Sequence, residues 1–213
     1  MWFERPPGRP DWGAAEAHLR RADPALARVI DRVGPCTLAP RRDYFVVLCK
    51  AIFTQQISTA VATTLFGRFR KLFPGQRPTP PLVLELLAGG DPALLRSCGL
   101  SRQKASYLAD LARHFVDGQV PTRRLARMDD EAVVDTLVRV RGIGRWTAEM
   151  FLMFSLNRPD VFPVDDLGLQ EAVRREYGLA TRPTPKQLLP YGDPWRPWRT
   201  VATWYLWRGG DKK

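Results

Sequence analysis

Two neighbouring carboxylates are the residues of this chain whose types and surroundings first suggest chemistry. Asp165 and Asp166 follow the apolar residues 161–164, and Leu167 and Leu169 come directly after them. Burial among apolar side chains raises the pKa of a carboxylate unless hydrogen bonds or a cation oppose it. Such a setting is typical of a catalytic acid or base, although either aspartate could equally cap the helix that follows.

A glycine-bounded turn, Gly142-Ile143-Gly144, lies upstream of the acids. The apolar residues before it recur at helical spacing, at Val133, Leu137 and Val140. Two glycines let the chain reverse its direction and approach another chain closely, and the N–H groups that open the next helix suit a phosphate. The triplet predicts a helix–hairpin–helix with a phosphate site, although most such triplets taken alone are plain turns.

Aromatic and amide side chains form the remaining candidates. Trp146, Met150 and Phe154 recur at helical spacing after the turn, and such spacing by itself favours a place in the core, as it does for Trp207. Gln55 and Gln56 end an apolar segment that begins after Asp43. On chemistry alone, the two amides are expected to satisfy the end of a helix.

The composition describes a basic, globular chain. Its 213 residues carry a formal net charge of +11, with 45% hydrophobic and 26% charged residues. This charge favours a polyanionic partner through phosphate contacts and counterion release, although a merely basic protein has it too. Cys36, Cys49 and Cys98 are scattered and have no CxxC spacing. We expect no disulfide framework and no zinc site, and three cysteines cannot hold a four-cysteine iron–sulfur cluster.

Periodicity and capping residues predict an all-α fold, since no segment shows sustained alternation bounded by hairpin turns. Residues 1–10 are Pro-rich and expected to be irregular, and residues 181–197 form a polar, Pro-bearing segment for which no helix is predicted. Helices are expected after Asp11, Asp23, Asp43, Ser58, Asp91 and Ser101, near residues 81–88, after Asp129 or Asp130, after the acid pair as far as Gly178, and over 199–208. In the helix after Ser58, the expected buried stripe is Val61, Leu65, Phe69 and Leu72.

The turn, the tryptophan after it and the loop FPVDD together resemble the helix–hairpin–helix–GPD superfamily of DNA glycosylases. Within that superfamily the chain resembles the 3-methyladenine DNA glycosylase II (AlkA-type) branch. The interval from Gly144 to Asp166 matches that family's interval from hairpin to catalytic aspartate. The resemblance covers roughly residues 44–207.

The resemblance implies two helical lobes with a cleft between them. The middle lobe would span about 51–157 and contain the hairpin at 133–156, and the second would combine 1–50 with 158–213. Full-length AlkA-type proteins also have a strand-rich N-terminal domain. The residues before Tyr44 leave no room for it, so we expect the compact form.

The resemblance also implies roles for the candidates. Asp166, ionised, would stabilise the oxocarbenium-like sugar as the glycosidic bond breaks, while Asp165 caps the next helix. The base pocket would contain Trp146, Met150, Leu167 and Trp207, because an aromatic face attracts a cationic alkylated purine. Some relatives have Tyr in place of Met150 and an aromatic residue in place of Leu167, so a roomier or less aromatic pocket is expected. Trp146 stands where strand-cutting members have a Schiff-base lysine, which implies no lyase activity.

The remaining implied roles concern the DNA backbone and a cation. Gln56, with Gln55, would fill the gap left by a flipped base, although Leu can occupy that slot in AlkA-type proteins. The backbone would be held by Gly142, Gly144, Arg145, Thr147 and Arg141, with Arg102, Lys104 and Arg199 as further contacts or as ordinary exposed charges. Main-chain carbonyls of Val138, Val140 and Ile143 would bind Na⁺ or K⁺, and no other cofactor is expected.

The sequence thus predicts a monomeric, monofunctional glycosylase that removes alkylated bases, such as 3-methyladenine and 7-methylpurines, from duplex DNA. Two alternatives stay open: a non-catalytic helix–hairpin–helix DNA-binding module, and a related glycosylase for uracil or other damaged bases. The acid pair favours an enzyme, since an acid near DNA costs affinity. No apolar h-region begins the chain and no run approaches the roughly 18 apolar residues of a membrane helix, so a cytoplasmic protein, nucleoid-associated if bacterial and without a membrane partner, is expected.

Overall fold

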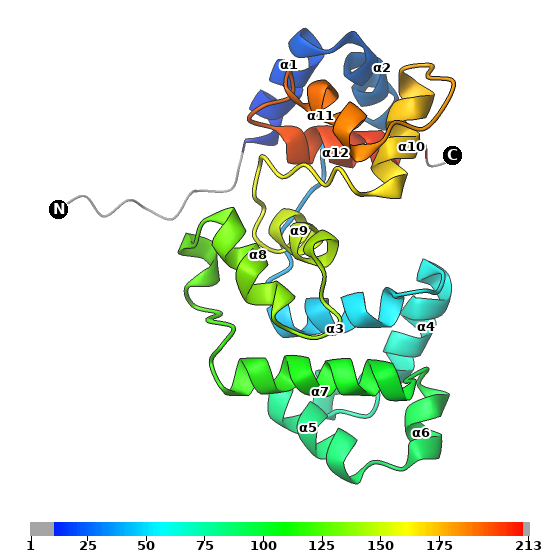
Figure 1. Cartoon of the computed structure of the whole chain (residues 1–213), viewed down its shortest axis with the longest axis vertical. Coiled ribbons are helices and arrows are strands. Elements are labelled where there is room, and N and C mark those ends of the chain that lie inside the picture. The colour runs from blue at the N-terminus through cyan, green and yellow to red at the C-terminus, as the bar shows by residue number, and fades with distance from the viewer. Residues whose placement is uncertain (1–10, 211–213) are drawn as a thin grey trace, which may run out of the picture. The chain divides into compact units, whose positions relative to one another are not determined.

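The computed structural model describes residues 11–210, apart from the side chain of Thr59, and every regular element among them is helical (Figure 1). The elements are α1 (Trp12–Ala22), α2 (Pro24–Val33), α3 (Tyr44–Thr54), α4 (Thr59–Arg70), η1 (Pro74–Gln76), α5 (Pro80–Gly89), α6 (Pro92–Ser97), α7 (Arg102–Val116), η2 (Leu125–Arg127), α8 (Asp130–Val138), α9 (Arg145–Phe154), α10 (Leu167–Glu176), α11 (Pro185–Gly192) and α12 (Arg199–Arg208). The predicted all-α class is confirmed. The irregular start predicted for residues 1–10 lies outside the described residues.

Two compact units divide the chain. Unit 1 combines Met1–Pro40 with Leu152–Lys213, and unit 2 is Arg41–Phe151. Both boundaries lie earlier than the predicted 51 and 157. The first boundary lies before α3 because α3 packs against α4 and α7, which places this helix in unit 2. The two ends of the chain join because α12 packs against α1, α2 and α10.

Unit 1 is organised around one buried carboxylate. Asp23 caps α2, since its Oδ1 accepts from the backbone N–H groups of Ala25 (2.9 Å) and Leu26 (3.1 Å). Its Oδ2 accepts from Trp195 Nε1 at 2.8 Å and from the Tyr177 hydroxyl. Burial, together with the bond to Asp23, raises the pKa of Tyr177. One acid therefore satisfies four donors from α2, the end of α10 and the segment before α12.

Aromatic side chains form much of the core of unit 2. Phe53 contacts Phe66 and Phe69 with ring centroids 5.3 and 5.1 Å apart, and Phe69 contacts Phe73 at 4.9 Å. The buried face of α4 is thus Ala62, Phe66 and Phe69. The predicted stripe was wrong at Val61, which is 49% exposed, because the larger phenylalanines turn the neighbouring face of the helix towards α3.

The predicted caps are confirmed at the starts of several helices. Side chains of Asp11, Asp23, Asp43, Ser58, Asp91, Ser101 and Asp129 each accept a backbone N–H from the first turn. The polar, Pro-bearing segment 181–197, for which no helix was predicted, contains α11. Thr184 and Gln187 form a reciprocal capping box there and Pro185 takes the first helical position, a combination that stabilises a helix start.

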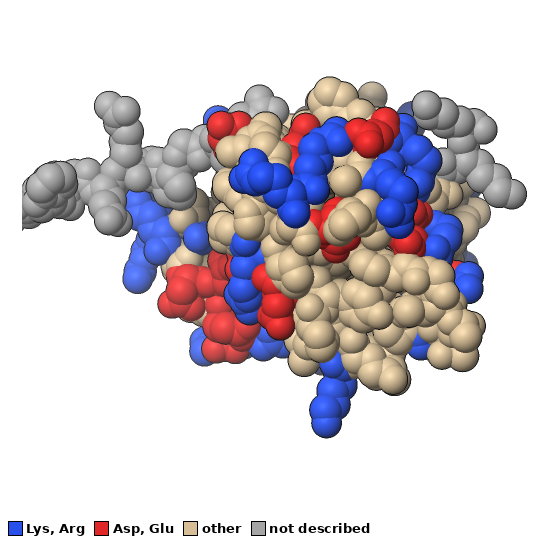
Figure 2. All heavy atoms as spheres, turned by 90° about the horizontal axis from the view of Figure 1, so that it is seen from above, with Lys and Arg blue, Asp and Glu red and all other residues tan. Residues whose placement is uncertain are grey.

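Charged side chains of both signs lie over much of the face shown in Figure 2, Lys and Arg interspersed with Asp and Glu, beside a broad area without charges. Ion pairs in unit 1 include Arg20–Asp31 at 2.5 Å and Arg32–Glu176 at 2.8 Å. The positive surplus is therefore not gathered into a single patch on that face. None of the helices within residues 11–210 is both long and apolar enough to cross a membrane.

Asp23→Ala is expected to lower the free energy of unfolding by about 3 kcal/mol or more, because a cap is lost and the buried donors of Tyr177 and Trp195 lose their acceptor. Asp11→Ala, which removes a single exposed cap, should cost about 1 kcal/mol. Urea denaturation of both variants provides the measurement. Equal losses would contradict the organising role of Asp23.

Candidate active site

The turn between α8 and α9 requires glycine at its first position. Gly142 has φ +85°, and a Cβ there would lie 2.3 Å from the ring of Tyr107 on α7. Val140 N donates to Leu137 O (3.1 Å) and Ile143 N donates to Val140 O (3.0 Å), which closes the turn. The surroundings of Gly144 are open, since a Cβ there would meet nothing within 4 Å. The predicted hairpin between two helices is therefore present.

The hairpin is held against α7 by Arg141. Its backbone N–H donates to Asp110 Oδ2 at 2.8 Å, and its guanidinium Nη2 donates to Ser106 Oγ at 2.5 Å. The side chain is still 64% exposed. Arg141 therefore positions the turn, and its charge remains at the surface.

The loop between α3 and α4 is attached to this hairpin. Gln55 donates its amide Nε2 to the carbonyl of Gly142 at 2.6 Å. Gln56, the next residue, is exposed and has a φ of +61°, a conformation that residues other than glycine seldom adopt. The two amides, predicted to act together, thus differ: Gln55 joins two segments, whereas Gln56 projects at the tip of the loop.

Lys104 satisfies the end of α3. Its ammonium donates to the carbonyls of Phe53 (2.8 Å) and Gln55 (3.0 Å), groups that have no acceptor role inside a helix that ends at Thr54. Burial lowers the pKa of this lysine. Gln55 is the C-cap residue of α3, but its side-chain amide does not satisfy the helix end, because the amide donates to Gly142 while Lys104 donates to the carbonyls. The same geometry turns Lys104 inwards, away from the phosphate contact considered for it.

Arg145, the basic residue at the start of α9, is less available to a phosphate than the sequence suggests. Arg145 forms a two-pronged pair with Glu131 on α8, at 3.0 and 2.6 Å. The hydrogen bonds from Arg145 lower the pKa of Glu131. Both side chains are more than half exposed, so solvent screens the pair and an anion could compete for the guanidinium. Thr147 is buried, with 8% exposure.

The aromatic residue after the hairpin is not in the core. Trp146 is 46% exposed, which contradicts the core position that helical spacing alone favoured. Met150, one turn later, is half-buried. A large apolar face at the surface of a helix is a common feature of binding sites.

In unit 1, Asp166 lies at the start of α10 and caps it. Its Oδ1 accepts from the backbone N–H of Leu169 at 2.5 Å and from Trp207 Nε1 at 2.9 Å. The expectation that Asp165 makes this cap was wrong, because the loop turns the side chain of Asp166 towards the helix and leaves Asp165 exposed. The first turn of a helix favours a negative charge, so α10 and the indole both hold the carboxylate in one orientation.

Trp207 completes the surroundings of this carboxylate. Its ring stacks on Phe154 with centroids 6.0 Å apart and planes at 24°, which orients the indole N–H. Gly168 leaves the space for the contact, since a Cβ there would lie 3.1 Å from Asp166 Oδ1 and 3.4 Å from Trp207 Nε1. Leu167, which lies between Asp166 and Gly168 in the sequence, is 60% exposed. The packing role of Phe154 and the need for glycine at 168 were not predicted, although a glycine directly after Asp-Asp-Leu was visible.

Hydrogen bonds from the last helix hold the loop that leads to Asp166. Thr200 Oγ1 donates to Arg158 O (2.6 Å) and accepts from Val161 N (2.9 Å). Arg199 donates to both carboxylate oxygens of Asp160, at 2.6 and 2.9 Å, and is therefore not the free phosphate contact considered for it. Arg102 is exposed. These hydrogen bonds restrict the conformation of the loop that leads to Asp166.

Comparison with known proteins places this arrangement in a family. The model described as "HhH-GPD superfamily base excision DNA repair protein" matches residues 49–197. DNA-3-methyladenine glycosylase 1 of Schizosaccharomyces pombe is 35% identical over 91% of this chain and 86% of its own length. The chain belongs to the HhH-GPD superfamily of base excision DNA repair proteins.

Two solved structures share the fold closely. The S. pombe 3-methyladenine DNA glycosylase Mag1, in complex with abasic DNA, has a TM-score of 0.80 at 34% identity, covering 91% of this chain and 95% of that one. The DNA-3-methyladenine glycosidase of Bacillus halodurans has a TM-score of 0.77 at 33% identity, covering 92% and 88%. The chain therefore resembles compact 3-methyladenine DNA glycosylases over nearly their whole length.

Lys104→Met is expected to loosen the loop that carries Gln56, because two carbonyls at the end of α3 lose a charged donor. The free energy of unfolding should fall by about 1–2 kcal/mol, and the amides of residues 54–57 should exchange with solvent faster. Arg113→Met, which removes an exposed charge from the same helix, is the matched control. Unchanged exchange at the loop would show that Lys104 does not hold it.

Proposed function

We propose that this chain is a DNA glycosylase that hydrolyses the bond between an alkylated base and deoxyribose in duplex DNA. The observation that carries the proposal is the fixed carboxylate of Asp166, whose Oδ1 accepts from two separate elements, the start of α10 and the side chain of Trp207. Its support from relatives is that the S. pombe and B. halodurans proteins to which the chain is similar are named for 3-methyladenine.

Asp166 acts on the sugar. As the N-glycosidic bond breaks, its electron pair leaves with the base and positive charge develops at the sugar carbon and ring oxygen. A carboxylate nearby stabilises that charge, as in glycoside hydrolysis, and orients the water that adds to the carbon and loses a proton. A 3-methyl or 7-methyl purine is cationic while bound to the sugar and leaves as a neutral base, so the reaction requires no strong general acid.

The base is received by apolar and aromatic side chains. We assign this role to Trp146, Met150, Leu167 and Trp207, each described above within its own unit. Trp146 and Leu167 are exposed despite their size, and stacking on Phe154 fixes the ring of Trp207. Aromatic side chains attract a cationic base. Leu167 and Met150 are flexible and aliphatic, which favours a site tolerant of several alkylated purines.

The DNA backbone is held by the hairpin. The first N–H groups of α9 have no partner inside the helix, and Gly144 leaves open space beside them, which suits a phosphate. Gly142 makes the turn, and Arg141 adds a positive charge at the surface. Arg145 can exchange Glu131 for a phosphate, and Thr147 supports the first turn from its buried position. Gln56, exposed at its loop tip, braces the gap left by the flipped base, while Gln55 ties that loop to Gly142.

The hairpin also suits a monovalent cation. Val138 ends α8, so its carbonyl lacks a partner inside the helix, and the carbonyl of Val140 accepts from Ile143 N and has a second lone pair for an ion. Oxygen donors of this kind fit Na⁺ or K⁺ held by Val138, Val140 and Ile143. Such an ion would add positive charge beside a phosphate. Monomeric state and cytoplasmic location stay predictions.

Asp166→Asn should lower the rate of base release from methylated duplex DNA by at least about 100-fold, because the charge that stabilises the sugar is lost. The amide oxygen still accepts from Leu169 N and Trp207 Nε1, so the fold is expected to persist. Asp165→Asn, one residue earlier and exposed, is the matched control and should act like wild type. Near-wild-type turnover by Asp166→Asn would remove the mechanism, and tight binding of abasic duplex without release of any base by wild type would favour a binding module.

The enzyme should leave the DNA strand intact after it removes a base. Trp146 carries an indole nitrogen, which cannot form a Schiff base with the sugar as a lysine does. Labelled duplex should therefore break only after heating in alkali, and borohydride should trap no covalent complex. Strand breaks at neutral pH in excess of those made by Asp166→Asn would contradict a monofunctional enzyme.

A further inference from the structure

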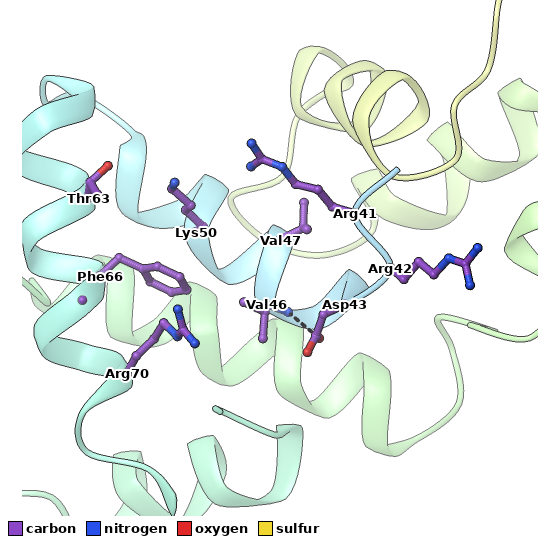
Figure 3. Close-up of a pocket in the computed structure, with 10 residues that line it drawn as sticks. Arg41, Arg42, Asp43, Val46, Val47, Lys50, Thr63, Phe66 and Arg70 are labelled. Carbon is purple, nitrogen blue, oxygen red and sulfur yellow. Dashed lines mark hydrogen bonds between the residues drawn. The ribbon is translucent and has the colours of Figure 1, made fainter. Parts of the chain in front are cut away.

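A basic hollow of about 450 Å³ lies between α3 and α4, and its lining includes none of the residues assigned to base, sugar or backbone (Figure 3). Its walls come from the two helices and from the segment just before α3. The residues that line it are Arg41, Arg42, Asp43, Val46, Val47, Lys50, Thr63, Phe66, Gly67 and Arg70. Every one of them belongs to unit 2, so the hollow is complete within that unit.

Three cations surround the hollow. Figure 3 shows Arg41 and Lys50 on one side, Arg70 on the other beside Phe66, and Arg42 directed away. Among the residues that the structure describes, Arg41, Lys50 and Arg70 form no ion pair with an acid. Like charges gathered without a counter-charge produce a strong local positive potential, which attracts an anion.

The one acid at the hollow is already engaged. Asp43 Oδ1 accepts from the backbone N–H of Val46 at 3.3 Å, and its Oδ2 accepts from Arg77 Nε at 3.1 Å. Its charge therefore stabilises the start of α3 and pairs with Arg77, which does not line the hollow. It does not neutralise Arg41, Lys50 or Arg70.

Arg70 is oriented by a neutral group. Its Nε donates to the carbonyl of Gln76 at 2.8 Å, which directs the outer nitrogens of the guanidinium without consuming its charge. A guanidinium held in this way offers two parallel N–H donors to a planar or tetrahedral oxyanion. Lys50, half-buried on α3, adds a point charge.

The floor of the hollow is apolar. Val46, Val47 and Phe66 line it, and Gly67 leaves space, since a Cβ there would meet nothing within 4 Å. A simple inorganic anion would not use such a floor, whereas a phosphate attached to a sugar or base would. We propose that this hollow binds the phosphate of a nucleotide unit, with Arg41, Lys50 and Arg70 on the phosphate and the sugar or base against Val46, Val47 and Phe66.

The nucleotide has two possible sources, a backbone position of bound DNA outside the flipped nucleotide or a free nucleotide. The inference goes beyond the glycosylase reaction, because none of the three cations contributes to the hairpin, the loop at Gln56 or Asp166. The site therefore should affect binding and leave the chemical step alone.

The test compares Lys50→Glu/Arg70→Glu with a matched control, Arg123→Glu/Arg127→Glu, which makes the same change of net charge at exposed positions of unit 2. One arm measures the affinity for abasic-site duplex as a function of salt. A DNA source predicts at least a tenfold weaker complex. It also predicts a slope of log affinity against log salt reduced by about 1 relative to the control, because one phosphate contact is lost.

The other arm titrates deoxyadenosine monophosphate into the full-length protein and follows backbone amide resonances. A free-nucleotide source predicts shifts at Val46, Val47 and Phe66 in wild type and control, and none in the hollow variant. Single-turnover base release at saturating protein should be unchanged in both variants, which separates this inference from the proposed function. A hollow variant that matches the control in both binding arms overturns the proposal.

Discussion

One carboxylate oxygen, Asp166 Oδ1, accepts hydrogen bonds from two separate helices. It caps α10 through Leu169 N at 2.5 Å and accepts the indole N–H of Trp207 at 2.9 Å. A helix cap and a side-chain partner leave the carboxylate one orientation, and the orientation of a charged group decides how strongly it stabilises charge that develops nearby. The stacking of Trp207 on Phe154, the glycine at 168 and the hydrogen bonds of Thr200 all serve that geometry.

In unit 2, a few side chains around the end of α3 hold both the hairpin and the Gln56 loop. Lys104 from α7 donates to the carbonyls of Phe53 and Gln55. The side chain of Gln55 donates instead to Gly142, and Gln56 is exposed. Arg141 and Tyr107 hold the hairpin to the same helix. The hairpin and the Gln56 loop are thus both fastened to α7, so a displacement of that helix would move both.

The sequence predicted most of the local structure because its signals were local. Asp11, Asp23, Ser58, Ser101 and Asp129 mark helix starts through bonds that span two or three residues, and the structure has a helix at each. It failed where two local signals competed. The stripe predicted from spacing included Val61, and only packing against α3 shows that Phe66 is buried in its place. Thr184 and Gln187 formed a capping box that the prolines around them obscured.

By itself, then, the sequence determined the helical class, the hairpin at Gly142 and the acid pair that ends the following loop, because residue type and spacing along the chain are enough to set them. The tertiary structure decided which acid faces inward, that Arg145 and Arg199 are paired, that Lys104 holds a loop, and that Arg41, Lys50 and Arg70 share one hollow. The reason is physical: each of these outcomes depends on a partner far away in the chain, and the energy of a buried or charged group is set by what packs against it.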